Sequence, residues 1–213
     1  MIAKIIPAIF LLAGFFVLVQ IAIPVINFKL WELANIEAKN ILVSPISESN
    51  RVLGVSIQNT RDNFPALISF SKREFIPYTE FLISVPRLDI EEAKVLVESN
   101  NLSEGLVHLP GTALPGEKGN IFISGHSAIP IIYRGSKNYR AIFANLQRLE
   151  KGDIIKVSAG GDFTYKVLGI RVVDPKETSV TLPPDGVGRY ISLMTCVPPG
   201  LNTKRLVVIG KMI

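Results

Sequence analysis

Residues 190–209 of the chain read YISLMTCVPPGLNTKRLVVI, and the expected fold is decided by this stretch. Two parts of it, 190–195 and 206–209, are rich in Ile, Leu and Val, which is the composition of β-strands. The sequence Pro198-Pro199-Gly200 between them stops the first strand, because proline has no N–H to donate to a β-ladder. We therefore expect two strands joined by a turn.

The same pattern of β-type runs and turns continues upstream as far as residue 81. Short apolar runs alternate with turn sequences such as Gly160-Gly161 and the PPDG of residues 183–186. Four further candidate strands cover residues 81–85, 121–124, 154–158 and 163–173, and one short helix is expected at 141–149. Many short strands at regular spacing predict an all-β domain, a closed barrel or a sandwich, of about 130 residues.

An uncharged stretch lies near the start of the chain, at residues 5–26. A helix of that length rises about 33 Å, which is enough to cross the hydrocarbon core of a bilayer. A cleaved signal peptide is the alternative, but the run is longer than a usual signal core and no Ala-x-Ala-like cleavage site follows it. We expect a single membrane anchor over residues 1–27. Lys4 before the span and Lys29 after it leave the topology open.

The segment after the anchor has two parts. Apolar residues recur at helical spacing over 28–42, which predicts an amphipathic helix. The periodicity then weakens, so residues 44–80 are interpreted as a linker and lead-in. The expected organisation is therefore an anchor at 1–27, a juxtamembrane helix and linker at 28–80, and a β-domain at 81–213.

The composition excludes several classes of function. A single cysteine excludes a disulfide framework, and one cysteine with two histidines supplies too few ligands for a zinc site made by this protein alone. The formal net charge is +5, but no basic cluster is interleaved with aromatic residues, so we expect no nucleic-acid binding.

Cys196 is the only thiol of the chain and ends the strand-like run at 190–195. A lone cysteine is ordinarily a small buried core residue. Two features favour chemistry instead. The Val197-Pro198-Pro199-Gly200 sequence places the thiol near the rim of a sheet, and a single cysteine is unusual in a domain outside the cytoplasm.

A thiolate nucleophile needs a proton donor for the leaving group, and histidine is the usual one. His126, at the end of the 121–124 run, and His108 are equally available candidates on composition alone. Arg205 follows Cys196 by nine residues and opens the next strand. A strand–turn–strand excursion could return its guanidinium to the thiol, where it would favour the thiolate and stabilise an oxyanion.

Together these residues resemble a known family. Residues 82–213 are similar to the sortases, the membrane-anchored cysteine transpeptidases of bacterial cell surfaces. The resemblance runs in order through ISVPRL (83–88), HLPGT (108–112), PGEKGN (115–120), SGH (124–126), SLMTC (192–196) and NTKRLVV (202–208). SLMTC corresponds to the TLxTC signature of the family, and NTKRLVV to its arginine strand.

The resemblance implies a closed eight-stranded β-barrel with short helices, preceded by one transmembrane helix. By position, Cys196 is the expected nucleophile, His126 the general acid and base, and Arg205 the residue that holds the substrate and its oxyanion. Leu193 and Thr195 of the signature are expected to bind substrate. No metal or organic cofactor is implied for the chemistry, although some members bind calcium.

The resemblance also implies the partners. The expected reaction cleaves an LPxTG-like sorting signal and joins the released acyl group to an amine of a peptidoglycan precursor or a pilin lysine. The expected substrates are surface or pilin proteins with C-terminal sorting signals. The topology of the family places the catalytic domain outside the cell membrane.

Departures from the family pattern leave the subclass open. Ser192 replaces the commoner threonine of the signature, and Ser127-Ala128 stand where many relatives carry Arg-Asp. The segment 129–140 is expected to reshape one wall of the substrate groove. The turn at 200–205 is similar to that of the pilin-type class C members, but residues 44–80 contain no Asp-Pro-aromatic plug.

Two alternatives differ in kind. An L,D-transpeptidase also uses Cys, His and Arg, but its His and Cys share one glycine-rich motif, whereas His126 and Cys196 are far apart in this sequence. A catalytically silent, membrane-anchored barrel would serve as a binding or assembly module. The presence of Cys196, His126 and Arg205 together argues against it.

Overall fold

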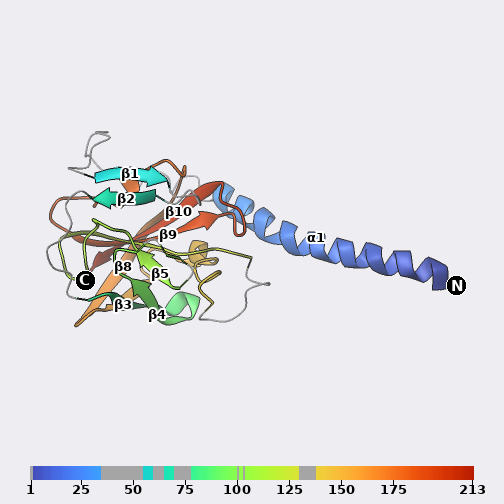
Figure 1. Ribbon diagram of the computed structural model, residues 1–213, viewed down its shortest axis with the longest axis horizontal. Coiled ribbons are helices and arrows are strands. Elements are labelled where there is room, and N and C mark those ends of the chain that lie inside the picture. The colour runs from blue at the N-terminus through green and yellow to red at the C-terminus, as the bar shows by residue number, and fades with distance from the viewer. Residues whose placement is uncertain are drawn as a thin grey trace.

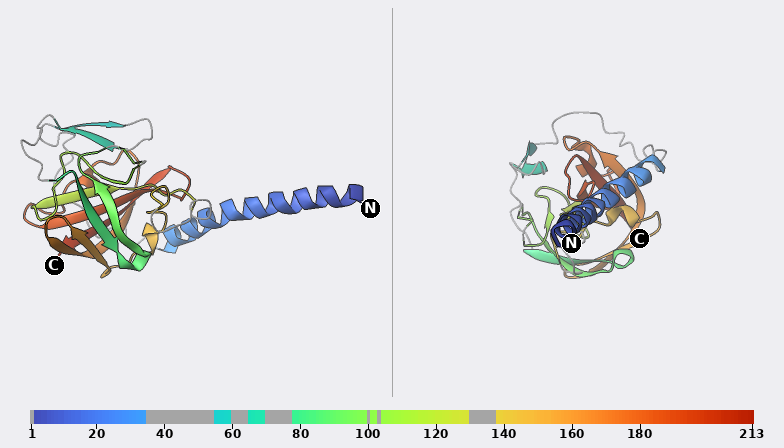
Figure 2. Two further views of the ribbon diagram at one scale, coloured as in Figure 1. Left: turned by 60° about the horizontal axis from the view of Figure 1, so that its bottom comes forward. Right: turned by 90° about the vertical axis from the view of Figure 1, so that its right-hand side faces the viewer.

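A computed structural model of the chain describes residues 2–34, 55–59, 65–69, 78–99, 101–102, 104–129 and 138–213. A long helix, α1 (Ile2–Ala34), extends from a β-barrel, and the N-terminus lies at the far end of this helix (Figure 1). The left view of Figure 2 shows that only the last turns of α1 reach the barrel.

The barrel closes through eight strands of the described chain, in the order β10-β8-β7-β3-β4-β5-β6-β9. Their bounds are β3 (Glu80–Val85), β4 (Ile90–Leu96), β5 (Leu106–His108), β6 (Gly119–Ser124), β7 (Ile154–Ser158), β8 (Asp162–Val173), β9 (Arg189–Val197) and β10 (Lys204–Met212). Short 3₁₀ segments lie between them at η2 (Pro86–Leu88), η3 (Leu146–Arg148) and η4 (Ser179–Thr181). The β4–β5 and β6–β9 pairs are parallel and the other pairs are antiparallel. The expectation of a closed eight-stranded barrel with short helices is confirmed.

All six strands that the sequence predicts are present, with ends that differ by at most three residues. Composition missed β4 and β5. In β4 the consecutive residues Glu91 and Glu92 are both exposed, and the register with β3 shifts at the same place, so the strand lacks period-two alternation. β5 has only three residues, which is too short for a period to show.

The short helix predicted at 141–149 is wrong. The segment is a succession of turns with a single 3₁₀ element, and its amides bond three residues back, for example Leu149 N–H to Leu146 O at 3.1 Å. Ile142, Phe143, Ala144, Leu146 and Leu149 are all buried. Burial in this segment therefore follows no single helical period, and the i→i−3 hydrogen bonds define its 3₁₀ turn.

The predicted linker contains regular structure. β1 (Val55–Asn59) and β2 (Pro65–Ser69) form an antiparallel hairpin inside the segment 44–80. The predicted amphipathic helix is described only as far as Ala34, where α1 ends; its remainder, residues 35–42, lies outside the described residues. The predicted boundary at residue 27 falls inside α1, whereas β3 begins one residue before the predicted start of the barrel.

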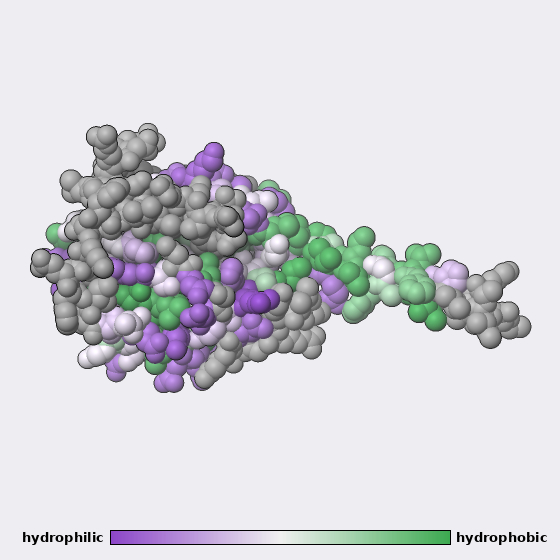
Figure 3. Space-filling model, in the orientation of Figure 1, coloured by the Kyte–Doolittle hydropathy of each residue, from purple (hydrophilic) through white to green (hydrophobic). Residues whose placement is uncertain are grey.

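Helix α1 is apolar along most of its length. The most apolar 18-residue window within Ile9–Ala34 has a mean hydropathy of 2.7 and is not buried by the rest of the protein. Figure 3 shows a hydrophobic rod attached to a body of mixed polarity. One such helix near the N-terminus is consistent with a single-pass membrane anchor.

The barrel has two buried apolar clusters, because successive residues of a barrel strand face inward and outward alternately. The interior cluster includes Ile191, Leu193 and Val197 of β9. The outer cluster includes Tyr190, Met194 and Cys196 of the same strand. Its members are Leu102, Val107, Leu109, Phe122, Val180, Tyr190, Met194, Cys196, Val207 and Ile209. The thiol therefore lies on the outer side of the barrel wall.

Candidate active site

Cys196 and Arg205 lie directly opposite each other on β9 and β10. Directly opposed residues of an antiparallel pair share one face of the sheet, with Cβ atoms about 4.5–5.5 Å apart. The return of the chain expected from the turn at 198–200 therefore occurs in a register that makes Arg205 and Cys196 cross-strand neighbours on one face of the sheet.

The hydrogen bonds of β9 show which kind of cross-strand pair Cys196 and Arg205 form. Gly125 N–H donates to Met194 O at 3.0 Å, and Ser127 Oγ–H donates to Cys196 O, so both carbonyls point towards β6 and away from β10. Cys196 and Arg205 are then a non-hydrogen-bonded pair of the β9–β10 ladder. Such pairs have Cα atoms about 4.5 Å apart, closer than hydrogen-bonded pairs.

His126 reaches the other side of Cys196 through the parallel β6–β9 pair. Each residue of β6 lies opposite the β9 residue seventy positions later, from Gly119 with Arg189 to Ser124 with Met194. The hydrogen bond from Gly125 N–H to Met194 O shows that the segment after β6 still lies beside β9. Continued by two residues, the same register brings His126 level with Cys196. We call His126, Cys196 and Arg205 the catalytic row, after the role that the sequence predicts for them; it crosses three adjacent chain segments.

One threonine hydroxyl and one serine hydroxyl bond the histidine loop, residues 125–127, to β9. Thr195 Oγ1 donates to Gly125 O at 2.8 Å, and the Ser127 hydroxyl donates to the carbonyl of Cys196. On the other side, Phe143 N–H donates to His126 O at 3.1 Å. The main chain of residues 125–127 is therefore bonded to β9 on one side and to Phe143 on the other, and the barrel fixes the place of His126 in the row.

Among the residues that the structure describes, Arg205 is the largest side chain that is almost completely buried, with an exposed fraction of 1%. Its Nη1 donates to Asn202 O at 3.0 Å and to Lys204 O at 3.1 Å, so the turn that carries the arginine also holds its guanidinium. Cys196 is 8% exposed. A buried cation beside a thiol lowers the free energy of the thiolate, because burial strengthens their attraction.

The second histidine is held inside the barrel. His108 has no exposed surface and, like Leu106 two residues earlier, faces the interior, where its ring packs edge-on against Phe81. Its Nδ1 accepts from Glu98 N–H at 3.4 Å, and its Nε2 lies 2.9 Å from Ala113 O. The barrel wall thus separates His108 from the outer face where Cys196 lies, a distinction that composition could not make.

Leu193 and Thr195 both lie in the wall of the barrel, on strand β9. Leu193 belongs to the interior cluster, and Thr195 is 1% exposed with its hydroxyl on Gly125 O. Both side chains are buried, and the substrate-binding role expected for them stays a prediction. Ser127, by contrast, differs from the family pattern, and no sequence signal indicates its bond to Cys196 O.

Two tyrosines of the barrel have perturbed acidities. Burial raises the pKa of Tyr165 to about 12. Burial also raises the pKa of Tyr190 to about 12, and the hydrogen bond and charge of Asp185 act in the same direction. The same hydrogen bond, with those from Gly188 and Val187 N–H, lowers the pKa of the Asp185 carboxyl. This network fastens the turn before β9 to its first residues.

The comparison with known proteins agrees with this geometry. The model of the sortase domain family matches residues 83–213. The chain belongs to the sortase family. Members of this family are cysteine transpeptidases, so the chain is an enzyme of that class.

Two curated sortases are similar to this sortase. Sortase D of Bacillus subtilis is 28% identical over 152 residues, which cover 67% of this chain and 70% of that protein. Sortase SrtE1 of Streptomyces coelicolor is 32% identical over 148 residues, but the match covers only 40% of it. Among solved structures, a Clostridium perfringens Sortase D5 transpeptidase has a TM-score of 0.53 at 27% identity, covering 63% of this chain and 79% of that one. Streptococcus pneumoniae Sortase C has a TM-score of 0.54 at 28% identity, covering 65% and 70%.

Proposed function

We propose that this sortase cleaves an LPxTG-like sorting signal and transfers the acyl fragment to an amine, with the catalytic row as its active site. The observation that carries the proposal is the row itself. Arg205 pairs with Cys196 on one side, and the β6–β9 register, continued past Ser124, brings His126 to the other side. A nucleophile needs a proton donor and an oxyanion partner at the same carbonyl carbon, and the row supplies one on each side.

In the first half-reaction, the Cys196 thiolate attacks the carbonyl carbon of the threonine in the sorting signal. The carbonyl oxygen becomes an oxyanion beside the Arg205 guanidinium, a fixed cation in a site that excludes water. The carbon–nitrogen bond to glycine breaks as His126 donates a proton to the departing amine. A thioester on Cys196 and a free glycine amine are the products.

In the second half-reaction, an amine attacks the thioester carbon and His126 removes its proton. The carbon–sulfur bond breaks, which regenerates the thiolate and leaves a new amide bond. The proposed amine belongs to a peptidoglycan precursor or to a pilin lysine. The proposed substrates are surface or pilin proteins with C-terminal sorting signals, which Sortase C of Streptococcus pneumoniae supports as a class, since its structure is described in terms of pilin substrate specificity.

We place the catalytic barrel on the outer side of the cell membrane. The support is α1, which has the length and apolar composition of a single-pass anchor and leaves the whole barrel on its C-terminal side. Sorting signals and wall amines are both accessible on that side.

The test uses the full chain in detergent with a panel of LPxTG-like peptides and a small amine. Mass spectrometry of the protein should find an acyl adduct on Cys196, and mass spectrometry of the peptides should find the amine-linked product. The Cys196→Ala variant should give neither. A wild-type protein whose thiol is alkylated readily but that forms no adduct with any peptide would reject the LPxTG-like motif. A thiol that resists alkylation in folded protein would favour the silent barrel.

A further inference from the structure

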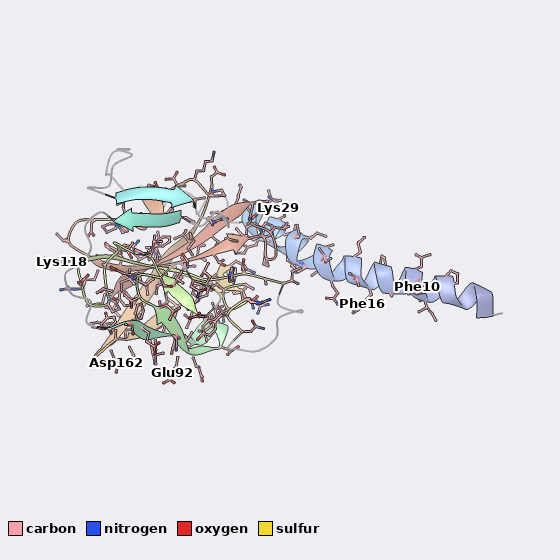
Figure 4. The ribbon with its side chains drawn as sticks, in the orientation of Figure 1. Phe10, Phe16, Lys29, Glu92, Lys118 and Asp162 are labelled. Atoms are coloured by element: carbon pink, nitrogen blue, oxygen red, sulfur yellow. The ribbon has the colours of Figure 1, made fainter. Side chains whose placement is uncertain are left out.

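The end of α1 is not a free stalk but is packed against the barrel. Phe28 is 2% exposed and belongs to the same buried cluster as the barrel interior, and the half-buried Trp31 packs against that cluster. The rings of Phe28 and Trp31 are stacked, with centroids 5.8 Å apart. Farther along the helix Phe16 is 62% exposed. In Figure 4, Lys29 lies where the helix meets the barrel, and Phe10 and Phe16 project from the free part of the rod.

An ion pair joins the same turn of α1 to the active-site strand. Glu32 Oε1 lies 3.2 Å from Lys204 Nζ, and Glu32 Oε2 lies 2.8 Å from Lys29 Nζ. Lys204 is the first residue of β10 and pairs with Val197 of β9. It therefore adjoins the catalytic row, whose next pair is Arg205 with Cys196.

Lys204 is also a direct partner of the arginine. Its carbonyl accepts a hydrogen bond from Arg205 Nη1 at 3.1 Å. The side chain of one residue thus reaches the membrane helix while its main chain holds the guanidinium. Any shift of Lys204 that follows loss of Glu32 is transmitted to Arg205 through this carbonyl.

We infer that the last turns of α1, Phe28 to Glu32, are a docked part of the catalytic barrel that positions Arg205 through Lys204. The membrane anchor is then the partner of this barrel surface, and it sets the height and orientation of the catalytic row above the bilayer. The docking stands on packing and the ion pair alone; only its effect on catalysis rests on the proposed function.

The test compares two neutralising substitutions in the full chain, reconstituted in lipid nanodiscs. Glu32→Gln breaks the pair with Lys204, whereas Lys29→Gln removes the other partner of the same carboxylate and leaves the Lys204 pair in place. A half-exposed ion pair changes a local equilibrium by up to about fivefold. Glu32→Gln should therefore raise amide exchange at the start of β10 by up to about fivefold and lower kcat with little change in KM, while Lys29→Gln should match wild type in both.

Phe28→Ala and Phe16→Ala form a second matched pair. Removing a buried phenyl from the interior cluster should raise amide exchange throughout β9 and β10, whereas removing the exposed phenyl should not. Equal exchange in Glu32→Gln and Lys29→Gln, together with unchanged barrel exchange in Phe28→Ala, would overturn the docking. Exchange that responds as expected in a wild-type protein without transfer activity would support the docking and reject the proposed function instead.

Discussion

Ser127→Ala should destabilise the active site, although the substitution removes only one hydroxyl group. Ser127 is 5% exposed, and its hydroxyl donates to the carbonyl of Cys196, which points towards the histidine loop and away from β10. The substitution removes one hydrogen bond and leaves a buried carbonyl without its donor on that side. Such a loss costs about 1–3 kcal/mol of unfolding free energy.

The chain offers a closely matched control, Ser124→Ala. Ser124 lies three residues earlier, is 1% exposed, and its hydroxyl makes no hydrogen bond within the described part of the chain. Removing that hydroxyl should be neutral or stabilising, because a buried polar atom without a partner opposes folding. Two serine-to-alanine changes on one strand and its extension should therefore have opposite effects.

Thermal unfolding and transfer kinetics together test the reasoning. For a domain of this size, the cost predicted for Ser127→Ala lowers Tm by roughly 3–10 °C. It should also lower kcat at a temperature where the protein is fully folded, because one of the two hydroxyl bonds between the histidine loop and β9 is lost. Ser127→Thr should restore part of that loss. Identical Tm and kcat in Ser127→Ala and Ser124→Ala would refute a positioning role for the Ser127 hydroxyl.

Substituting each histidine in turn should have different effects. His126→Gln is expected to lower the rate of transfer by about 10²–10⁴-fold without unfolding the protein. His108→Gln is expected to lower Tm, because a buried, hydrogen-bonded ring is lost. Peptide kinetics and calorimetry of both variants check this, and similar activity losses per folded molecule would contradict it. Arg205→Lys should lower kcat by at least about 100-fold, since an ammonium cannot bond both carbonyls and face an oxyanion as a planar guanidinium does; near-normal turnover would make Arg205 purely structural. Because burial raises the pKa of Tyr165 to about 12, the unfolded chain loses this proton near pH 10 and the folded chain does not, so the free energy of unfolding should fall between pH 10 and 12 by up to about 1.4 kcal/mol per pH unit. Denaturant titrations of wild type and Tyr165→Phe at several pH values should show a shallower fall in the variant, and equal slopes would assign the effect elsewhere.

Part of the site could be predicted from sequence because it depends on local order. The Pro-Pro-Gly turn between two apolar runs is enough to predict that the chain returns past Cys196, and the structure makes Arg205 its cross-strand neighbour. The uncharged run at 5–26 likewise predicts a membrane-length helix without any tertiary information, since bilayer thickness alone sets the length required.

The errors have equally physical causes. β4 was missed because a register irregularity sets Glu91 and Glu92 both on the surface, which hides the alternation. The segment 141–149 has the composition of an α-helix, but it buries five of its nine residues in a succession of turns with one 3₁₀ element. Propensity yields to packing where the two disagree.

The apolar helix, the β-rich domain and the three side chains of the catalytic row can be predicted from the order of the residues alone. Which of these side chains lie next to one another depends on the fold. His108 and His126 cannot be distinguished by composition. Strand alternation points His108 into the barrel, whereas the parallel β6–β9 register, continued past Ser124, brings His126 level with Cys196. The bond of Ser127 to Cys196 O and the docking of Phe28 depend on contacts between residues far apart in the chain. Such contacts have no period and no local signature, since they arise only when the closed barrel fixes the separate segments in space.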